Sequence, residues 1–157
     1  MKLCLLCVGK TDVPFVDVAN EIYVNRLKHY IQTDLAMIPE HKSWKKMKAP
    51  ERVKAEGQAI LEKLKSTDAV YLLDEKGKQY SSEGFAELLQ KKMNSGVNRV
   101  VFVVGGAYGF SDELYKRYPQ KISLSKMTFS HQMIRCFFLE QAYRAMTILK
   151  GEPYHNS

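Results

Sequence analysis

The sequence predicts an α/β domain in which a mainly parallel sheet carries helices on both faces. Short apolar runs alternate with helical patterns along the whole chain, and this alternation is typical of βαβ units. Two of the runs, residues 2–9 and 99–104, are almost continuously apolar, as in strands buried on both faces. The length of 157 residues supports one real core, so we expect a single domain over residues 1–157.

The strand at 2–9 is followed by a helix over about 12–31, because Pro14 favours the first turn of a helix. The apolar stripe of this helix consists of Phe15, Val18, Ile22 and Leu27. Residues 34–40 then predict a short strand. Pro39 places this strand toward the sheet edge, since proline cannot donate to a ladder.

A helix over 50–65 comes next, with one apolar side facing inward. That side consists of Val53, Ile60, Leu61 and Leu64. The third strand, 68–75, ends at a turn predicted for residues 77–78, and Ser81 then caps a helix that Gly96 ends. The inward residues of that helix are Phe85, Leu88, Leu89 and Met93.

The last third of the chain begins with the strongest strand, 99–104, and a short helix that Ser111 caps. A final strand at 121–125 precedes a long helix over 131–150. Gly151 ends this helix, as glycine commonly does.

Polar or glycine-rich loops follow the last two strands. These loops are GGAYG (105–109) and LSKMTF (124–129). Carboxyl ends of parallel strands meet at one sheet edge, so we expect a small-molecule pocket there, with Leu73 as an apolar wall. Few charges and many backbone groups suit an adenine ring and a neutral or zwitterionic ligand, since only Lys126 would address an anion. A plain tight turn is the alternative for 105–109, whose glycines lack the order of a dinucleotide fingerprint.

The final helix is apolar around most of its circumference, which is unusual for an outer helix of a small α/β domain. We therefore expect it to form a symmetric dimer interface. Glu140 and Arg144 interrupt the apolar surface at a spacing that a structural ion pair explains by itself. Beyond the helix, Tyr154 and His155 can fold back over a site, where the imidazole can exchange a proton.

The formal net charge of +7 permits an anionic partner such as RNA without requiring one. Much of the excess lies in HKSWKKMK (41–48), which also holds the single Trp. These residues either contact RNA phosphates while the Trp stacks on a base, or form a solvated loop that the Trp anchors. Both interpretations stay open.

Cys4 and Cys7 have the spacing of a redox or zinc motif, yet both lie in the strand at 2–9. Strand residues three apart point to opposite faces, and the chain has no second ligand pair for zinc. We therefore expect two buried apolar cysteines and no metal. No apolar run approaches the roughly 20 residues that span a bilayer, so we expect a cytoplasmic protein.

The segment from VVFVVGGAYG (100–109) to GEPYH (151–155) resembles the ribosomal RNA large subunit methyltransferase H family. The motifs that carry the likeness are SKMTF-x-HQ, EQ-x-YRA and the terminal P-Y-H. Further matches at LCLLCVGK, GQAILEKLK and LLDEKGKQYSSEGFAELL extend it over nearly the whole chain. These proteins are SPOUT, or α/β-knot, methyltransferases. The resemblance implies a C-terminal trefoil knot, which periodicity alone does not predict.

The resemblance further implies methyl transfer from S-adenosylmethionine to N3 of a pseudouridine in 23S ribosomal RNA. The enzyme would act as a homodimer on the assembled ribosome. Carried over by position, the cofactor contacts are Leu73, Gly105, Leu124, Ser125, Lys126, Met127, Thr128 and Phe129. Tyr154 and His155 would lie near the target base, with Glu140 and Arg144 on the interface helix.

Two positions depart from the family pattern. Ser130 stands where the family commonly has proline, so we expect a looser turn before the last helix. Asn156 and Ser157 extend the chain past the Tyr-His pair. Neither departure changes the expected function.

The implied reaction needs a nucleophile in line with a sulfonium methyl, and removal of the N3 imide proton creates one. His155 is the candidate base or positioning group, and Arg144 or Arg135 would offset the developing negative charge. Two rivals remain. One is a nucleotide-binding oxidoreductase that uses the glycine loop, and the other is a non-catalytic RNA-binding module.

Overall fold

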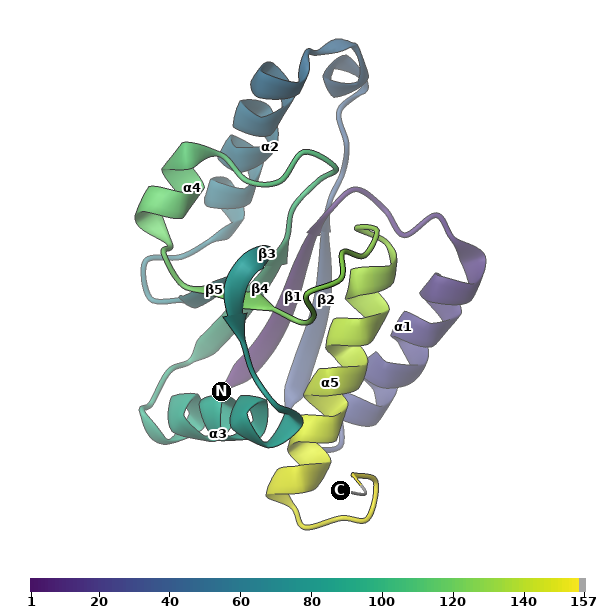
Figure 1. Cartoon of the computed structure of the whole chain (residues 1–157), viewed down its shortest axis with the longest axis vertical. Helices are drawn as coiled ribbons and strands as arrows, with labels where there is room; N and C mark the ends of the chain where they lie inside the picture. The colour runs from purple at the N-terminus through teal and green to yellow at the C-terminus, as the bar shows by residue number, and fades with distance from the viewer. Residues whose placement is uncertain (156–157) are drawn as a thin grey trace.

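Five parallel strands form one sheet in the order β2-β1-β4-β3-β5, as the computed structural model shows for residues 1–155 (Figure 1). The strands are β1 Lys2–Val8, β2 Gln32–Ile38, β3 Ala69–Gln79, β4 Arg99–Val104 and β5 Lys121–Ser123. β2 lies at an edge of the sheet, as predicted. Asn156 and Ser157, expected to extend the chain past the Tyr-His pair, lie outside the described residues.

Helices cover both faces of the sheet. They are α1 Pro14–Leu27, α2 Ala49–Lys63, α3 Ser82–Asn94, α4 Asp112–Arg117 and α5 Met133–Leu149, with a 3-10 helix, η1, at Lys42–Lys46. α1, α3 and α5 pack on one face, and α2, α4 and η1 pack on the other (Figure 1). The predicted three-layer α/β arrangement is confirmed.

Each face of the sheet has its own apolar core. β1 contributes side chains to both cores, because successive strand residues point to opposite sides of a sheet. Cys7 lies in the core beneath α5, whereas Cys4 lies in the core beneath α2. Both thiols are buried, as expected. Burial raises the pKa of the Cys7 thiol to about 12, so it stays protonated and unreactive at neutral pH.

Local sequence signals set most helix boundaries. The Ser81 hydroxyl accepts the Gly84 amide at 3.1 Å, and the Ser111 hydroxyl accepts the Leu114 amide at 3.4 Å. Both predicted N-caps are therefore confirmed. α1 ends at Leu27, a turn earlier than expected, because the chain at 28–30 tightens before entering β2.

The turn predicted at residues 77–78 is wrong, because β3 continues through it to Gln79. β3 bends so that Ile122 of β5 pairs first with Leu73 and again with Lys78. A Cβ on Gly77 would lie 2.5 Å from the carbonyl carbon and the nitrogen of Ile122. Glycine at position 77 thus lets the backbones of β3 and β5, which are far apart in the sequence, approach each other closely.

The apolar stripe predicted to face inward on α1 faces outward instead. Phe15 is 66% exposed, Val18 58% and Ile22 45%, and of the predicted stripe only Leu27 is buried. α1 packs through Val16, Asn20 and Leu27, so its second apolar side has no partner within residues 1–155. The sequence periodicity identified an apolar face but could not say what covers it.

Trp44 is 6% exposed and packs in the core beneath α2. Stacking of this ring on an RNA base, which the sequence left open, is therefore excluded in this conformation, and the anchoring interpretation is confirmed. The charged side chains around it remain exposed. Among residues 1–155, the structure contains no helix with the length and apolar character needed to cross a membrane.

Candidate functional site

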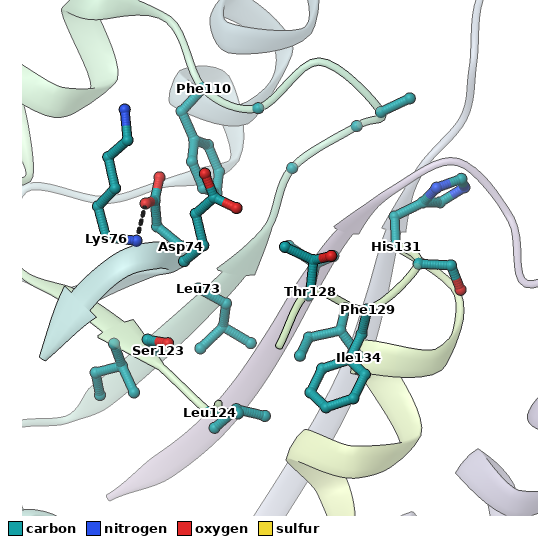
Figure 2. A pocket seen from close by; sticks show the side chains of 18 of the residues that line it. Leu73, Asp74, Lys76, Phe110, Ser123, Leu124, Thr128, Phe129, His131 and Ile134 are labelled. Carbon is teal, nitrogen blue, oxygen red and sulfur yellow. Dashed lines mark hydrogen bonds between the residues drawn. The ribbon is translucent and has the colours of Figure 1, made fainter. Parts of the chain in front are cut away.

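A cavity of about 620 Å³ opens at the carboxyl ends of β3, β4 and β5 (Figure 2). β3 lies between the other two strands, and its Leu73 pairs with Val104 on one side and Ile122 on the other. The loops that follow β4 and β5 therefore rise on either side of Leu73. This arrangement is the sheet-edge pocket that the sequence predicted.

The structure brings almost all of the sequence-predicted cofactor residues together in the lining of this cavity. Those lining it are Leu73, Gly105, Leu124, Ser125, Met127, Thr128 and Phe129. Lys126 is exposed and does not line the cavity, so the single cation expected to address an anion lies elsewhere.

Acidic side chains line the cavity on the β3 side, and no sequence pattern predicted them. Asp74 and Glu75 follow Leu73 directly. The Asp74 carboxylate accepts the Tyr115 hydroxyl at 2.5 Å. It also accepts the Lys76 amide at 2.8 Å, as Figure 2 shows. Burial, and then the bond to Asp74, raise the pKa of Tyr115 above its usual value, so its hydroxyl stays a donor. The spacing of residues could not have found Asp74, whose position depends on where β3 bends after Leu73.

The glycine loop at 105–109 is packed tightly from behind. A Cβ on Gly105 would lie 3.1 Å from the Phe110 ring and 3.2 Å from the Gly109 carbonyl oxygen. Behind Gly106 stands the Glu56 carboxylate, which is 1% exposed and would overlap a Cβ there. Arg52 holds that carboxylate through its Nε at 2.7 Å. The loop can therefore present backbone groups to a ligand while a buried side chain supports it.

The second loop is ordered by its own serines. The Ser123 hydroxyl donates to the Ser125 carbonyl at 2.7 Å, and the Ser125 hydroxyl accepts the Met127 amide at 2.9 Å. The turn before α5 was expected to be looser with serine in place of proline, but the Ser130 hydroxyl accepts the Met133 amide at 3.2 Å. The Ser130 side chain therefore orders this turn by binding the amide of the first residue of α5.

The residues predicted to be catalytic gather at the other end of α5. The Arg144 guanidinium binds Glu140 through Nη2 at 2.6 Å, so the structural ion pair exists. The Tyr154 hydroxyl donates to the same Glu140 oxygen at 3.1 Å. His155 lies with Nδ1 3.4 Å from the Arg144 Nη1 and Nε2 2.7 Å from Glu83 of α3. The tail thus folds back onto the helix and forms one cluster.

Two ionisation states follow from this cluster. Burial, a bond to Tyr23 and the charge of Glu140 raise the pKa of Tyr154 well above its usual value, so its phenol stays protonated. Its own backbone amide, and then His155, lower the pKa of Glu83 to about 2. At neutral pH Glu83 is therefore ionised, while the Tyr154 phenol is neutral.

Within one chain, the cavity and this tail cluster are separated by most of α5. Ile134 lines the cavity, and ten residues of helix at 1.5 Å each place Arg144 about 15 Å further along the axis. Arg135, the alternative to Arg144 for offsetting charge on the base, does not belong to the tail cluster. It is fully buried and donates to Val8, Thr11 and His131, so it fastens the start of α5 to the end of β1.

Comparison with known proteins gives matches over the full chain. A family model described as "Predicted SPOUT methyltransferase" matches residues 1–155. Curated relatives from Christiangramia forsetii and Flavobacterium johnsoniae, each named "Ribosomal RNA large subunit methyltransferase H", are 53% and 52% identical over 156 residues. A relative of the same name from Parabacteroides distasonis is 53% identical over 157 residues. Each alignment covers 99% of both chains.

Proposed function

The chain belongs to the SPOUT methyltransferase family, and on this premise we propose that it methylates N3 of a pseudouridine in 23S ribosomal RNA. Members of the family use S-adenosylmethionine, and membership in the family implies that this chain has the α/β knot. The curated relatives carry the name of a methyltransferase of large-subunit ribosomal RNA and match from end to end. The enzyme class and the substrate RNA follow from this likeness, and the chemistry of the cavity supports the methyl donor.

The cavity suits S-adenosylmethionine in size and in chemistry. Its volume of about 620 Å³ lies within the range of small-molecule sites. Leu73, Ile122 and Leu124 offer apolar walls for an adenine ring, and the two loops offer backbone donors and acceptors. A cofactor with a sulfonium and an ammonium group also benefits from the nearby Asp74 and Glu75 carboxylates.

The same charges argue against the oxidoreductase alternative. A dinucleotide brings a pyrophosphate, which needs cations or a helix N-terminus beside it. The cavity offers Asp74 and Glu75 against Lys76, and Lys126 is not part of its lining. This acidic lining is the observation that carries the assignment to a cationic methyl donor.

We expect the active enzyme to be a homodimer. The exposed apolar stripe of α1, Phe15, Val18 and Ile22, lies on the same side of the sheet as α5, where Phe137 is also exposed. Isologous pairing of these faces would cover both stripes. It would also run two α5 helices in opposite directions, so that the tail cluster of one subunit approaches the cavity of the other. The separation of cavity and tail within one chain is the main support for this arrangement.

In the proposed reaction, the cofactor supplies a methyl group on sulfonium sulfur, and the chain's own residues prepare the nucleophile. Glu83 holds His155 through Nε2, so His155 would accept or position the N3 proton of the base at Nδ1, once the 3.4 Å contact of Nδ1 with Arg144 opens. Arg144 then offsets the negative charge on the deprotonated base. Tyr154, whose phenol stays protonated, donates a hydrogen bond and does not act as a base.

Methyl transfer to whole ribosomes, compared with naked 23S RNA, tests the function directly. We expect the wild type to label ribosomes and His155→Ala to lose rate at saturating cofactor and ribosomes, while its affinity for S-adenosylhomocysteine is unchanged. Full rate in that variant would refute the role of His155. Calorimetry that compares the binding of S-adenosylhomocysteine with the binding of NAD tests the oxidoreductase alternative. Mass spectrometry of 23S RNA from a deletion strain separates the non-catalytic module, which would leave every methyl group in place.

A further inference from the structure

Four exposed lysines surround a buried tryptophan at the carboxyl edge of the sheet. Lys42, Lys45, Lys46 and Lys48, here named the lysine turn, are all exposed. They belong to η1 and to the residue that precedes α2. None of the ion pairs within residues 1–155 involves them.

Trp44 gives the lysine turn a fixed position. Its ring is buried with Ile38 and Ile60 in the core beneath α2, and its amide donates to the His41 carbonyl at 3.0 Å. The Met47 amide in turn donates to the Trp44 carbonyl at 3.1 Å. The four ammonium groups therefore project from an anchored turn and not from a loose loop, which reduces the entropy lost when they bind.

The lysine turn lies at the same end of the sheet as the cavity. β2 ends at Ile38, shortly before the lysine turn, and Ile38 pairs with Val8 of β1. The preceding β1 residue, Cys7, pairs with Val104 of β4, which lines the cavity. Two strand spacings separate β2 from β4, about 10 Å. Arg52, one turn into α2, lies with its guanidinium carbon 5.8 Å from the ring centroid of Tyr108, another lining residue.

The opposite edge of the sheet is electrically different. There Lys2 pairs with Asp34 at 2.5 Å, and Arg99 pairs with Asp68. At the amino edge these two cations are thus paired with local carboxylates, whereas no ion pair in the described part of the chain involves the lysine turn. The lysine turn places four unpaired cations on the side where the substrate base must arrive.

We propose that the lysine turn binds the phosphate backbone of the substrate RNA beside the target nucleotide. The inference rests on the proposed function and adds to it a surface that positions the RNA. Lysine suits this role because its ammonium group is a point charge that binds phosphate without reading the base. No base is stacked by Trp44, so the contact is electrostatic and independent of local sequence.

The test replaces all four lysines by glutamine and compares ribosome binding, methyl transfer and cofactor binding. A matched control carries Lys63→Gln, Lys65→Gln, Lys91→Gln and Lys116→Gln, four exposed lysines that do not line the cavity, and so has the same net charge. We expect the first variant to raise the KM for ribosomes about tenfold or more at 0.1 M salt. Its plot of log affinity against log salt should be shallower by about 3, since each lost phosphate contact removes roughly 0.7 to 0.9. Its kcat and its affinity for S-adenosylhomocysteine should stay at the wild-type level.

Equal KM values and salt slopes for the two variants would overturn the proposal. So would loss of binding to ribosomes with full binding to a naked 23S fragment, since the partner would then be a ribosomal protein. Failure of the wild type to methylate ribosomes would instead refute the proposed function. In that case direct binding of the RNA fragment, followed through the emission of the single Trp44, still tests the lysine turn. Thermal unfolding of both variants confirms that they fold.

Discussion

The Glu56 carboxylate fills the space where a side chain on Gly106 would stand, so a buried acid directly supports the loop that lines the cavity. Arg52 holds one carboxylate oxygen of Glu56 and also reaches Glu40 at 3.0 Å. The second oxygen, Oε2, has no hydrogen-bond partner within residues 1–155. The position of the glycine loop thus depends on α2, which contributes no residue to the cavity lining.

We expect Gly106→Ala to weaken cofactor binding, because the new methyl group overlaps a carboxylate that Arg52 prevents from rotating away. Displacing the loop should cost about 2 kcal/mol and lower the affinity for S-adenosylhomocysteine at least tenfold, as calorimetry can measure. Gly84→Ala on α3 is the control, since its Cβ meets only ordinary contacts. In a Glu56→Ala background the overlap is gone, so Gly106→Ala should then have a much smaller effect. Simple additivity of the two changes would contradict this account.

Gly77→Ala should destabilise the whole domain. Its Cβ would lie 2.5 Å from backbone atoms of Ile122, and backbone cannot move aside as a flexible side chain can. We expect a loss of about 3 kcal/mol or more in the free energy of unfolding, measured by urea denaturation. Gly96→Ala serves as the control: it has open space but a φ of 73°, so strain alone should cost about 1 kcal/mol. A Gly77→Ala protein as stable as this control would show that the strands can separate at the crossing.

Val18→Glu should convert the proposed dimer to a monomer. The side chain is 58% exposed in one chain, so the fold should tolerate the charge, whereas a buried dimer interface should not. Analytical ultracentrifugation should show the monomer mass, and methyl transfer should be lost while S-adenosylhomocysteine still binds. Gln58→Glu, an exposed change on α2, should leave both mass and activity unchanged. A Val18→Glu protein that stays dimeric would exclude the α1 stripe as the interface.

Glu83→Gln should loosen His155 and reduce kcat without changing the affinity for S-adenosylhomocysteine. The wild-type carboxylate has a pKa lowered to about 2, by its own backbone amide first and by His155 second. Because the pKa of Glu83 is depressed in the folded protein, the ionised Glu83 stabilises the fold at pH values above its ordinary pKa of about 4.5. This stabilisation is lost as the pH falls toward 2. Any loss of activity between pH 8 and 6 must therefore come from another group. The same pH profile for both proteins, with lower kcat in the variant, is the expected result, and unchanged kcat would remove Glu83 from the site.

Much of the cavity was predictable because its parts are local in sequence. Buried strands, the caps at Ser81 and Ser111 and the two loops each follow from a few neighbouring residues, and parallel strands bring their carboxyl ends together. Asp74 and Glu75 escaped prediction because a carboxylate within a strand carries no signal of its own. Arg135 was misjudged because its partners at Val8 and Thr11 are more than 120 residues away.

The sequence by itself determined the α/β class, the order of its elements and the family to which the chain belongs, because periodicity, capping and motif residues act over short spans. Only the tertiary structure decided that the α1 stripe faces outward, that Gly77 meets the backbone of Ile122, and that Trp44 is buried beneath exposed lysines. These outcomes depend on which surfaces meet when distant segments pack. Hydrophobic pattern identifies a face, but packing selects its partner.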